Sequence, residues 1–275
     1  MKNKIEIIIL YHSGAGSTKT IAEIFYNKLT SFFSCDIENI YLDYNFDKLS
    51  EYDFIIFGFP TYHCEPSESM MDFIKKMPKF PEVKNAFVFT TYGLYTGNTE
   101  KIFVKSCKHK NINTCGSNAY KAPATDGVLL FPSMDFMFKY GEEVPNKIKK
   151  DINFIKDTLK SDVYKSNYIP RIKLYTILNY PNKLFGKNFT RNISIINNKC
   201  IGCEKCVNEC IRDCWKKEKD KRVWNSDNCE SCFKCVHHCP SSAIILSEKT
   251  LNKPKFNNDF YKKIKNDLIQ DINRE

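Results

Sequence analysis

Nine of the 13 cysteines lie between Cys200 and Cys239, and eight of them form two runs with the same spacing. The runs are Cys200, Cys203, Cys206 and Cys210, then Cys229, Cys232, Cys235 and Cys239. This spacing is typical of iron–sulfur sites, where three thiolates of one run hold a cubane and the fourth ligates the cluster of the other run. The pattern predicts two [4Fe-4S] clusters, one on Cys200, Cys203, Cys206 and Cys239, the other on Cys229, Cys232, Cys235 and Cys210.

Zinc sites and disulfides are the alternatives for so many cysteines. Paired C-x-x-C elements bind zinc with four ligands per metal, whereas each run here ends in a cysteine that serves elsewhere. A disulfide framework is disfavoured because the chain opens Met1-Lys2-Asn3-Lys4 without an apolar signal segment. With no run of about 18 apolar residues either, we expect a soluble protein in a reduced, anaerobic cytoplasm.

The two cysteine runs differ in the residues that follow them. Pro240 follows Cys239, but Ile211 follows Cys210, and Cys214 adds a ninth thiol close by. Because eight ligands satisfy two cubanes, we expect Cys214 to be unligated. Substitution for a lost ligand is its alternative role.

A small-residue loop near the N-terminus is a candidate anion site. An apolar strand-like run from Ile5 to Tyr11 leads into Ser13, Gly14, Ala15, Gly16, Ser17 and Thr18, and an amphipathic helix reaching Phe32 follows. Backbone N–H groups, hydroxyls and the positive end of a helix dipole would converge there on a phosphate. The third glycine of a dinucleotide fingerprint is absent, since Lys19 occupies its place. An ordinary glycine turn is the alternative.

Two further strands end in loops that would meet the first one. The strand expected over residues 52–62 ends in Pro60, Thr61 and Tyr62. The strand expected over residues 86–91 ends at Thr91, and Tyr92, Gly93 and Tyr95 lie in the loop that follows. In an open parallel sheet, ligands bind beyond the carboxyl ends of the strands at the switch point. We therefore expect the three loops to share one crevice.

These loops resemble the FMN-binding loops of short-chain flavodoxins, and the cysteine runs resemble bacterial two-cluster ferredoxins. Together they identify the chain as similar to the flavodoxin–ferredoxin fusion proteins of anaerobic bacteria. The resemblance implies an α/β fold with a doubly wound five-stranded parallel sheet of order 2-1-3-4-5, plus a small α+β ferredoxin domain. It also implies that the first loop cradles the FMN phosphate and that Tyr62 with Tyr92 or Tyr95 flanks the isoalloxazine.

Several residues depart from the flavodoxin pattern or adjoin it. Ala15 and Ser17 stand where flavodoxins usually have threonine and asparagine, but the backbone donors and Thr18 remain, so we still expect bound FMN. His63 and Cys64 follow Tyr62 directly. Either side chain could lie at the flavin edge as proton donor or nucleophile, or serve packing alone.

The 275 residues suggest more than one domain. We expect a flavodoxin-like domain over 1–160, a basic aromatic linker over 161–190, a ferredoxin domain over 191–250 and a C-terminal amphipathic helix over 251–275. One helix is expected to begin at Glu65, and a second is expected to be capped by Asn98. A third is expected along the apolar stripe from Val144 to Leu159. Residues 131–138 are aromatic and could cover the flavin or face the second domain, and a short strand is expected over 191–196.

Charge is concentrated in the second half. Residues 161–275 carry a net charge of +9 of the total +10, and the stretch 161–199 alone carries +6. Part of this excess balances anionic clusters, and the rest predicts a redox partner with an acidic docking surface. Interleaved aromatic and basic residues of the linker can also bind nucleic acid or membranes, but packing of its aromatics on the domains is the simpler interpretation.

Three functions remain open at this point. The first is an electron-transfer protein that relays electrons between the clusters, FMN and external redox proteins. The second is a flavin-dependent reductase of a quinone, nitro compound or ferric chelate, supported by His63 and Cys64. The third is a redox-sensing binding module. No catalytic motif decides whether the chain is an enzyme, and the oligomeric state is not encoded in any pattern that we recognise.

Overall fold

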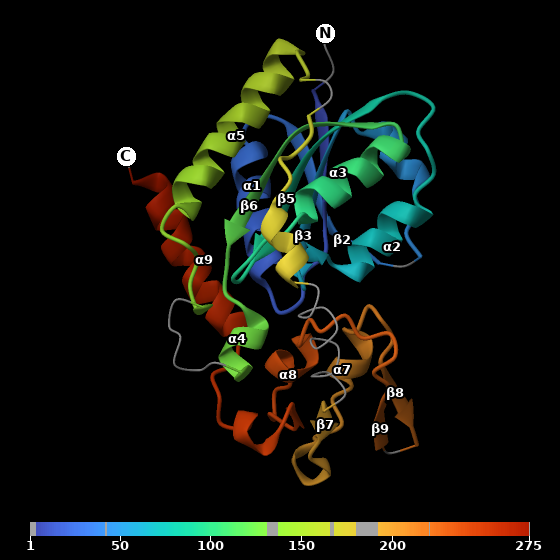
Figure 1. Ribbon diagram of the computed structural model, residues 1–275, viewed down its shortest axis with the longest axis vertical. Coiled ribbons are helices and arrows are strands. Elements are labelled where there is room, and N and C mark those ends of the chain that lie inside the picture. Colours follow the sequence, from blue (N-terminus) through green and yellow to red (C-terminus); the bar gives the residue numbers. More distant parts are fainter. Residues whose placement is uncertain are drawn as a thin grey trace.

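A parallel sheet with helices on both faces forms the larger part of the molecule (Figure 1). The computed structural model describes residues 4–41, 43–130, 137–165, 168–179, 192–219 and 221–274. The sheet has the strand order β2 (Ser34–Asn39), β1 (Glu6–Tyr11), β3 (Phe54–Tyr62), β5 (Lys84–Tyr92) and β6 (Ile112–Lys121). All neighbours are parallel. Counted over these five strands the order is 2-1-3-4-5, which confirms the predicted doubly wound sheet.

Strand β1 shows why the sheet is covered on both sides. Ile7 and Ile9 pack in a core with helices α1 (Ser17–Leu29) and α5 (Val144–Ser161). Ile8 and Leu10 pack in the opposite core with α2 (Glu68–Lys76) and α3 (Thr99–His109). Side chains of a strand alternate between faces, so a strand buried on both faces must be apolar throughout.

Two predicted helix ends were wrong, and one predicted cap is right in position only. Helix α1 ends at Leu29, and Phe32 lies beyond it, 46% exposed, with Lys156 Nζ 3.8 Å from its ring centre. Helix α2 begins at Glu68, because β4 (Glu65–Pro66) pairs antiparallel with the end of β3. Asn98 stands at the N-cap position of α3, as predicted, but its side chain makes no capping hydrogen bond. Its Oδ1 accepts a hydrogen bond from the Lys173 amide at 2.8 Å instead.

The cysteine runs lie in the smaller part, below the sheet in Figure 1. Its strands are β7 (Ser194–Ile195), which pairs antiparallel with β10 (Ile244–Ile245), and the hairpin β8 (Trp215–Glu218) and β9 (Lys221–Trp224). Its helices are α7 (Lys205–Asn208) and α8 (Lys234–His238). Helix α4 (Thr125–Leu130) and 3₁₀ turns at 47–51, 174–179, 197–199 and 248–250 complete the described elements. The predicted strand over 191–196 is shortened to β7.

The C-terminal helix α9 (Asn258–Asn273) returns to the larger part, as its apolar stripe allows. Leu268 and Ile272 are buried in the core shared with α1 and α5, and Lys265 Nζ lies 2.6 Å from Glu23 Oε2 of α1. The helix therefore ties the end of the chain to its beginning. Among the described helices, including the 18-residue α5, none has the length and apolar composition of a membrane span.

Replacing Leu268 with alanine tests this docking. Leu268 is 3% exposed, and the variant should lower the free energy of unfolding by about 2–4 kcal/mol, since a buried leucine loses packing and leaves a cavity. Urea unfolding followed by circular dichroism measures the change. The exposed Gln270→Ala on the same helix is the control and should stay within about 0.5 kcal/mol of the parent. Equal effects of both variants would contradict docking of α9.

The described linker residues pack on the larger part. Tyr168 Oη lies 3.2 Å from Ser117 Oγ, and Tyr175 Oη lies 3.3 Å from Thr96 Oγ1. Lys173 Nζ forms an ion pair with Glu100 Oε2 at 3.3 Å. These contacts agree with the packing interpretation of the linker. Tyr164 stacks on Phe54 of β3. The other aromatic residues of the linker, Tyr180, Phe185 and Phe189, lie outside the described residues, as do residues 131–136 of the predicted aromatic cover.

Candidate cofactor site

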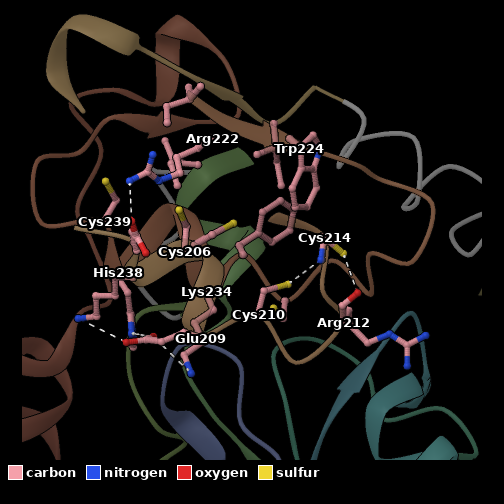
Figure 2. A pocket seen from close by; sticks show the side chains of 18 of the residues that line it. Cys206, Glu209, Cys210, Arg212, Cys214, Arg222, Trp224, Lys234, His238 and Cys239 are labelled. Atoms are coloured by element: carbon pink, nitrogen blue, oxygen red, sulfur yellow. Dashed lines mark hydrogen bonds and ion pairs between the residues drawn. The ribbon is translucent and has the colours of Figure 1, made fainter. Parts of the chain in front are cut away.

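All eight cysteines of the two runs line one cavity, together with Cys214. We call it the cysteine cavity. Figure 2 shows Cys206 and Cys239 on one side of it and Cys210 and Cys214 on the other. Each run reaches the cavity from a loop followed by one short helix, α7 for the first run and α8 for the second. The two runs thus bring their thiols to a common interior.

Within the cavity the cysteines act on one another electrostatically. Burial raises the pKa of the Cys206 thiol, and the charges of Cys239 and Cys203 raise it further. Burial raises the pKa of Cys235 to about 12, with Trp215 opposing and Cys229, Cys210 and Cys206 adding to the rise. Thiols of both runs are therefore neighbours within one cavity.

Several of these sulfurs accept backbone hydrogen bonds, as thiolate ligands do. The donors are the amide of Cys214 to Cys210 Sγ (3.4 Å), of Ser231 to Cys229 Sγ (3.4 Å) and of Ala243 to Cys239 Sγ (3.2 Å). Hydrogen bonds to ligand sulfurs are one of the factors that set cluster potentials. The donor set therefore fits iron–sulfur chemistry.

Cys214 is buried, and its thiol donates to the Arg212 carbonyl at 3.6 Å. Its backbone amide donates to Cys210 Sγ at 3.4 Å, and its side chain also interacts with the thiols of Cys210 and Cys229. We therefore expect Cys214→Ala to keep the parent's iron content of about eight atoms per chain, because eight other thiols remain. Iron and sulfide analysis of anaerobically purified protein measures this. Loss of about half the iron would make Cys214 a ligand.

The three predicted loops line a second cavity, the three-loop cavity, of about 460 Å³. All thirteen predicted cofactor-binding residues except Gly16 line it, namely Ser13, Gly14, Ala15, Ser17, Thr18, Pro60, Thr61, Tyr62, Thr91, Tyr92, Gly93 and Tyr95. Its volume lies in the usual range of about 300–1,000 Å³ for small-molecule sites. The loops converge because they follow the carboxyl ends of the adjacent strands β1, β3 and β5.

The first loop opens the amino end of helix α1 toward this cavity. The first-turn N–H groups of a helix have no intrahelical acceptor and attract anions. Thr18 Oγ1 lies 2.8 Å from Thr91 Oγ1, which ties the first loop to the third. Gly16 has a φ of 150° and packs against the ring of Tyr261 from α9. Tyr261 Oη lies 3.0 Å from Ser17 Oγ, so the C-terminal helix covers the outer side of the loop.

The aromatic residues of the cavity take different positions. The Tyr62 hydroxyl lies against Gly14, and Tyr95 is 58% exposed at the cavity mouth. His63 and Cys64 both line the cavity, with φ of 50° and 63°. Two consecutive left-handed residues of this kind are strained backbone, which is often found at functional sites.

The two cavities share a wall. Ser13 and Phe233 line both of them, and Ser231 of the second cysteine run lines the three-loop cavity. A Cβ at Gly14 would lie 3.1 Å from Cys232 Cβ. The loop expected to bind phosphate therefore touches the second run of cysteines.

A buried contact between Glu230 and His12 joins the two parts at this junction. Glu230 is 3% exposed; its Oε1 lies 2.7 Å from His12 Nε2, and its Oε2 accepts from both the amide and the hydroxyl of Ser69 at 2.9 Å. Burial alone would raise the pKa of Glu230, but the charge and hydrogen bond of His12 and the donors of Ser69 lower it overall. Arg212 adds an ion pair to Asp72 of α2 at 2.6 Å.

Helix α8 presents two histidines to the larger part. His238 Nε2 donates to the Ala15 carbonyl at 2.7 Å, and its Nδ1 lies 3.1 Å from Glu209 Oε2. His237 Nε2 donates to the Thr125 carbonyl at 2.9 Å, while its Nδ1 accepts from the Phe256 amide at 3.1 Å. Burial lowers the pKa of His237 to about 3, in agreement with a neutral ring. Residues beside the cysteines thus hold the loops of the other cavity.

Sequence reasoning missed the residues of this junction. Phe233 could have been found, since it lies within the Cys232–Cys235 spacing, where a bulky aromatic residue must pack against something. Glu230 stands next to Cys229, but nothing in the sequence connects it with His12. Tyr261 lies beside the apolar stripe of α9 rather than in it.

Comparison with known proteins places these parts in two families. A family model described as a flavodoxin domain matches residues 8–140. The ferredoxin of Methanothermococcus thermolithotrophicus is 37% identical over 60 residues, which are 21% of this chain and all of that protein. The archaeal-type glutamate synthase [NADPH] of Dehalococcoides mccartyi is 29% identical over 58 residues, but the chain spans 12% of its length.

Solved flavodoxins are similar to the larger part. A flavodoxin from the domain Archaea covers 57% of this chain and 99% of its own, with 18% identity and a TM-score of 0.42. The two-electron reduced flavodoxin of Megasphaera elsdenii covers 41% and 84%, with 20% identity and a TM-score of 0.38.

Fold, crevice and cysteine runs define a redox protein with a flavodoxin-like and a ferredoxin-like part. The chain belongs to the flavodoxin–ferredoxin fusion family. This membership supports a role in electron transfer, with FMN and iron–sulfur clusters as the cofactors of its two parts.

Proposed function

We propose that the chain relays electrons between two [4Fe-4S] clusters in the cysteine cavity and FMN in the three-loop cavity, and exchanges them with external redox proteins. The observation that carries this proposal is the shared wall of Ser13 and Phe233. Electron tunnelling falls off steeply with distance, so two centres separated by one layer of side chains can exchange electrons directly. When bound, the clusters supply one-electron transfer and FMN supplies one- or two-electron transfer.

The proposed cluster ligands are Cys200, Cys203, Cys206 and Cys239 for one cluster and Cys229, Cys232, Cys235 and Cys210 for the other. The spacing of the two runs supports this division, since the fourth cysteine of each run ligates the cluster of the other. Over the described residues, which include every cysteine, no three ligand side chains converge as a single metal ion would need.

The proposed FMN site uses backbone donors for the phosphate and aromatic faces for the ring. The amides of the first loop and the Thr18 hydroxyl lie at the amino end of α1, where a phosphate is favoured. Tyr92 and Tyr95 on the third loop line the remaining volume, and an aromatic face suits a flat ring. The Tyr62 hydroxyl holds the first loop at Gly14.

Cofactor analysis tests the proposal. Protein purified without oxygen should contain about eight iron atoms, about eight sulfides and about one FMN per chain. One cluster per chain, zinc in place of iron, or no affinity for added FMN would each contradict it.

A second function is favoured by the mouth of the three-loop cavity. Leu94 and Tyr95 line the cavity and are 47% and 58% exposed, and His63 and Cys64 lie in its wall. A small acceptor could reach bound flavin there, as a reductase of a quinone, nitro compound or ferric chelate requires. Sustained turnover of such an acceptor that is lost in His63→Ala would favour the reductase. Absence of turnover with all three classes of acceptor would exclude the reductase and leave electron exchange with proteins as the function.

A further inference from the structure

We propose that the β8–β9 hairpin and the first cysteine loop form the docking face for an acidic one-electron carrier protein. The face comprises Lys216, Lys217, Lys219 and Lys221 of the hairpin with Ile201 and Cys203 of the loop. This inference rests on the proposed function, because it assigns the place where external redox proteins meet the relay.

The hairpin and the cysteine loop are joined into one surface. Arg222 Nη2 donates to the Gly202 carbonyl at 3.1 Å and lies 3.2 Å from Glu204 Oε1. Lys217 Nζ pairs with the same carboxylate oxygen. Gly202, with a φ of 71°, turns the loop at this contact. The hairpin is therefore held against the residues between Cys200 and Cys206.

The charge of this face is too large and too exposed to serve only the clusters. Residues 215–224 contain five basic and two acidic residues. Arg222 is the buried one and lines the cysteine cavity, whereas the four lysines are all exposed. Lys217 is paired with Glu204, so Lys216, Lys219 and Lys221 are the exposed cations that an external partner can meet.

Apolar residues complete the face. Ile201 is 67% exposed and Val223 38% exposed, and Cys203 is exposed beside Ile201. An apolar centre with a charged rim is the usual composition of a transient protein interface. Charge complementarity steers such encounters and selects the partner. A cationic rim therefore selects an acidic protein.

This face and the three-loop cavity meet different cysteines. Cys232 lies against Gly14 of the first loop, whereas Cys203 reaches the surface. In each encounter one electron would leave the partner, which is oxidised, and reduce the cluster that Cys203 would hold. No bond or proton is exchanged.

The test uses an acidic two-cluster ferredoxin that is stable when reduced. Calorimetry at low and at moderate salt measures its affinity for the protein with all cofactors bound. Lys216→Glu combined with Lys219→Glu should raise the dissociation constant by about tenfold or more at low salt. This pair is chosen because Lys217 pairs with Glu204 and Lys221 stands opposite Glu218. The charge-matched control, Lys149→Glu with Lys150→Glu on exposed positions of α5, should change affinity less than about threefold.

Separate outcomes overturn the docking face and the relay. Equal weakening by both double variants, or affinity that does not fall with salt, overturns the docking face. Absence of a concentration-independent exchange phase between clusters and FMN after flash reduction overturns the relay, and both double variants should retain that phase. The iron content and melting temperature of each variant establish that it folds. The milder double variant, Lys216→Gln with Lys219→Gln, should give an intermediate loss of affinity for the ferredoxin. If the glutamate double variant of Lys216 and Lys219 kept its affinity for the ferredoxin but no longer bound a single-stranded oligonucleotide that the parent protein binds, the face would be assigned to nucleic acid instead.

Discussion

Replacing Cys232 with alanine is expected to lower the iron content from about eight to about four atoms per chain. Cys232 belongs to the second run, and its neighbours in the cavity include Cys235 and Cys229. Loss of one thiolate leaves one cubane with three ligands, whereas the set that contains Cys203 and Cys239 is intact. Iron and sulfide analysis with EPR of the reduced protein measures the change.

The matched control for this variant is Cys64→Ala, a buried cysteine of the three-loop cavity. It should keep the parent's iron content. Because Cys214 lies next to Cys210, a double variant with Cys214→Ala excludes rescue by the ninth thiol. Full iron content in that double variant would refute the assignment of Cys232 as a ligand.

Replacing Gly14 with alanine is expected to weaken FMN binding by about tenfold or more. The added Cβ would clash with the Tyr62 hydroxyl and lie 3.1 Å from Cys232 Cβ and 3.2 Å from the Cys232 carbonyl. Overpacking of this kind costs about 1–3 kcal/mol, and each 1.4 kcal/mol is about tenfold in affinity. Fluorescence titration of flavin-depleted protein with FMN measures the dissociation constant.

Gly141→Ala is the control for this substitution. Its added Cβ would meet only the flexible carboxylate end of Glu143, so FMN affinity should be unchanged. If Gly14→Ala bound FMN as tightly as the parent protein, the phosphate would not lie against the first loop.

The parallel sheet was predictable because its strands are buried on both faces. Ile7 to Leu10 leave no polar position, so the strand cannot lie at a solvated face. The stripe along α5 was predictable for the corresponding reason, since Val144, Ile148 and Ile152 recur at helical spacing. The start of α2 was harder to predict, because Glu65 and Pro66 form β4 against the end of β3. The side chain of Asn98 bonds to the amide of Lys173, which is distant in sequence.

The two halves of the site differ in how much the sequence discloses. Cysteine spacing is local, so the two runs can be recognised from the sequence alone. The junction between the cavities depends on contacts such as His12 with Glu230, which are 218 residues apart. Neither residue carries a pattern of its own, and a buried ion pair is defined only by the fold. The covering of the first loop by Tyr261 has the same origin.

The central claim is that electrons pass between the clusters and FMN within one chain, across the wall of Ser13 and Phe233. Flash reduction of the fully loaded protein, followed by the separate absorbance changes of clusters and flavin, tests it most directly. The account predicts an exchange phase whose rate constant does not change with protein concentration. A rate that rises in proportion to protein concentration, or no exchange at all, would contradict it.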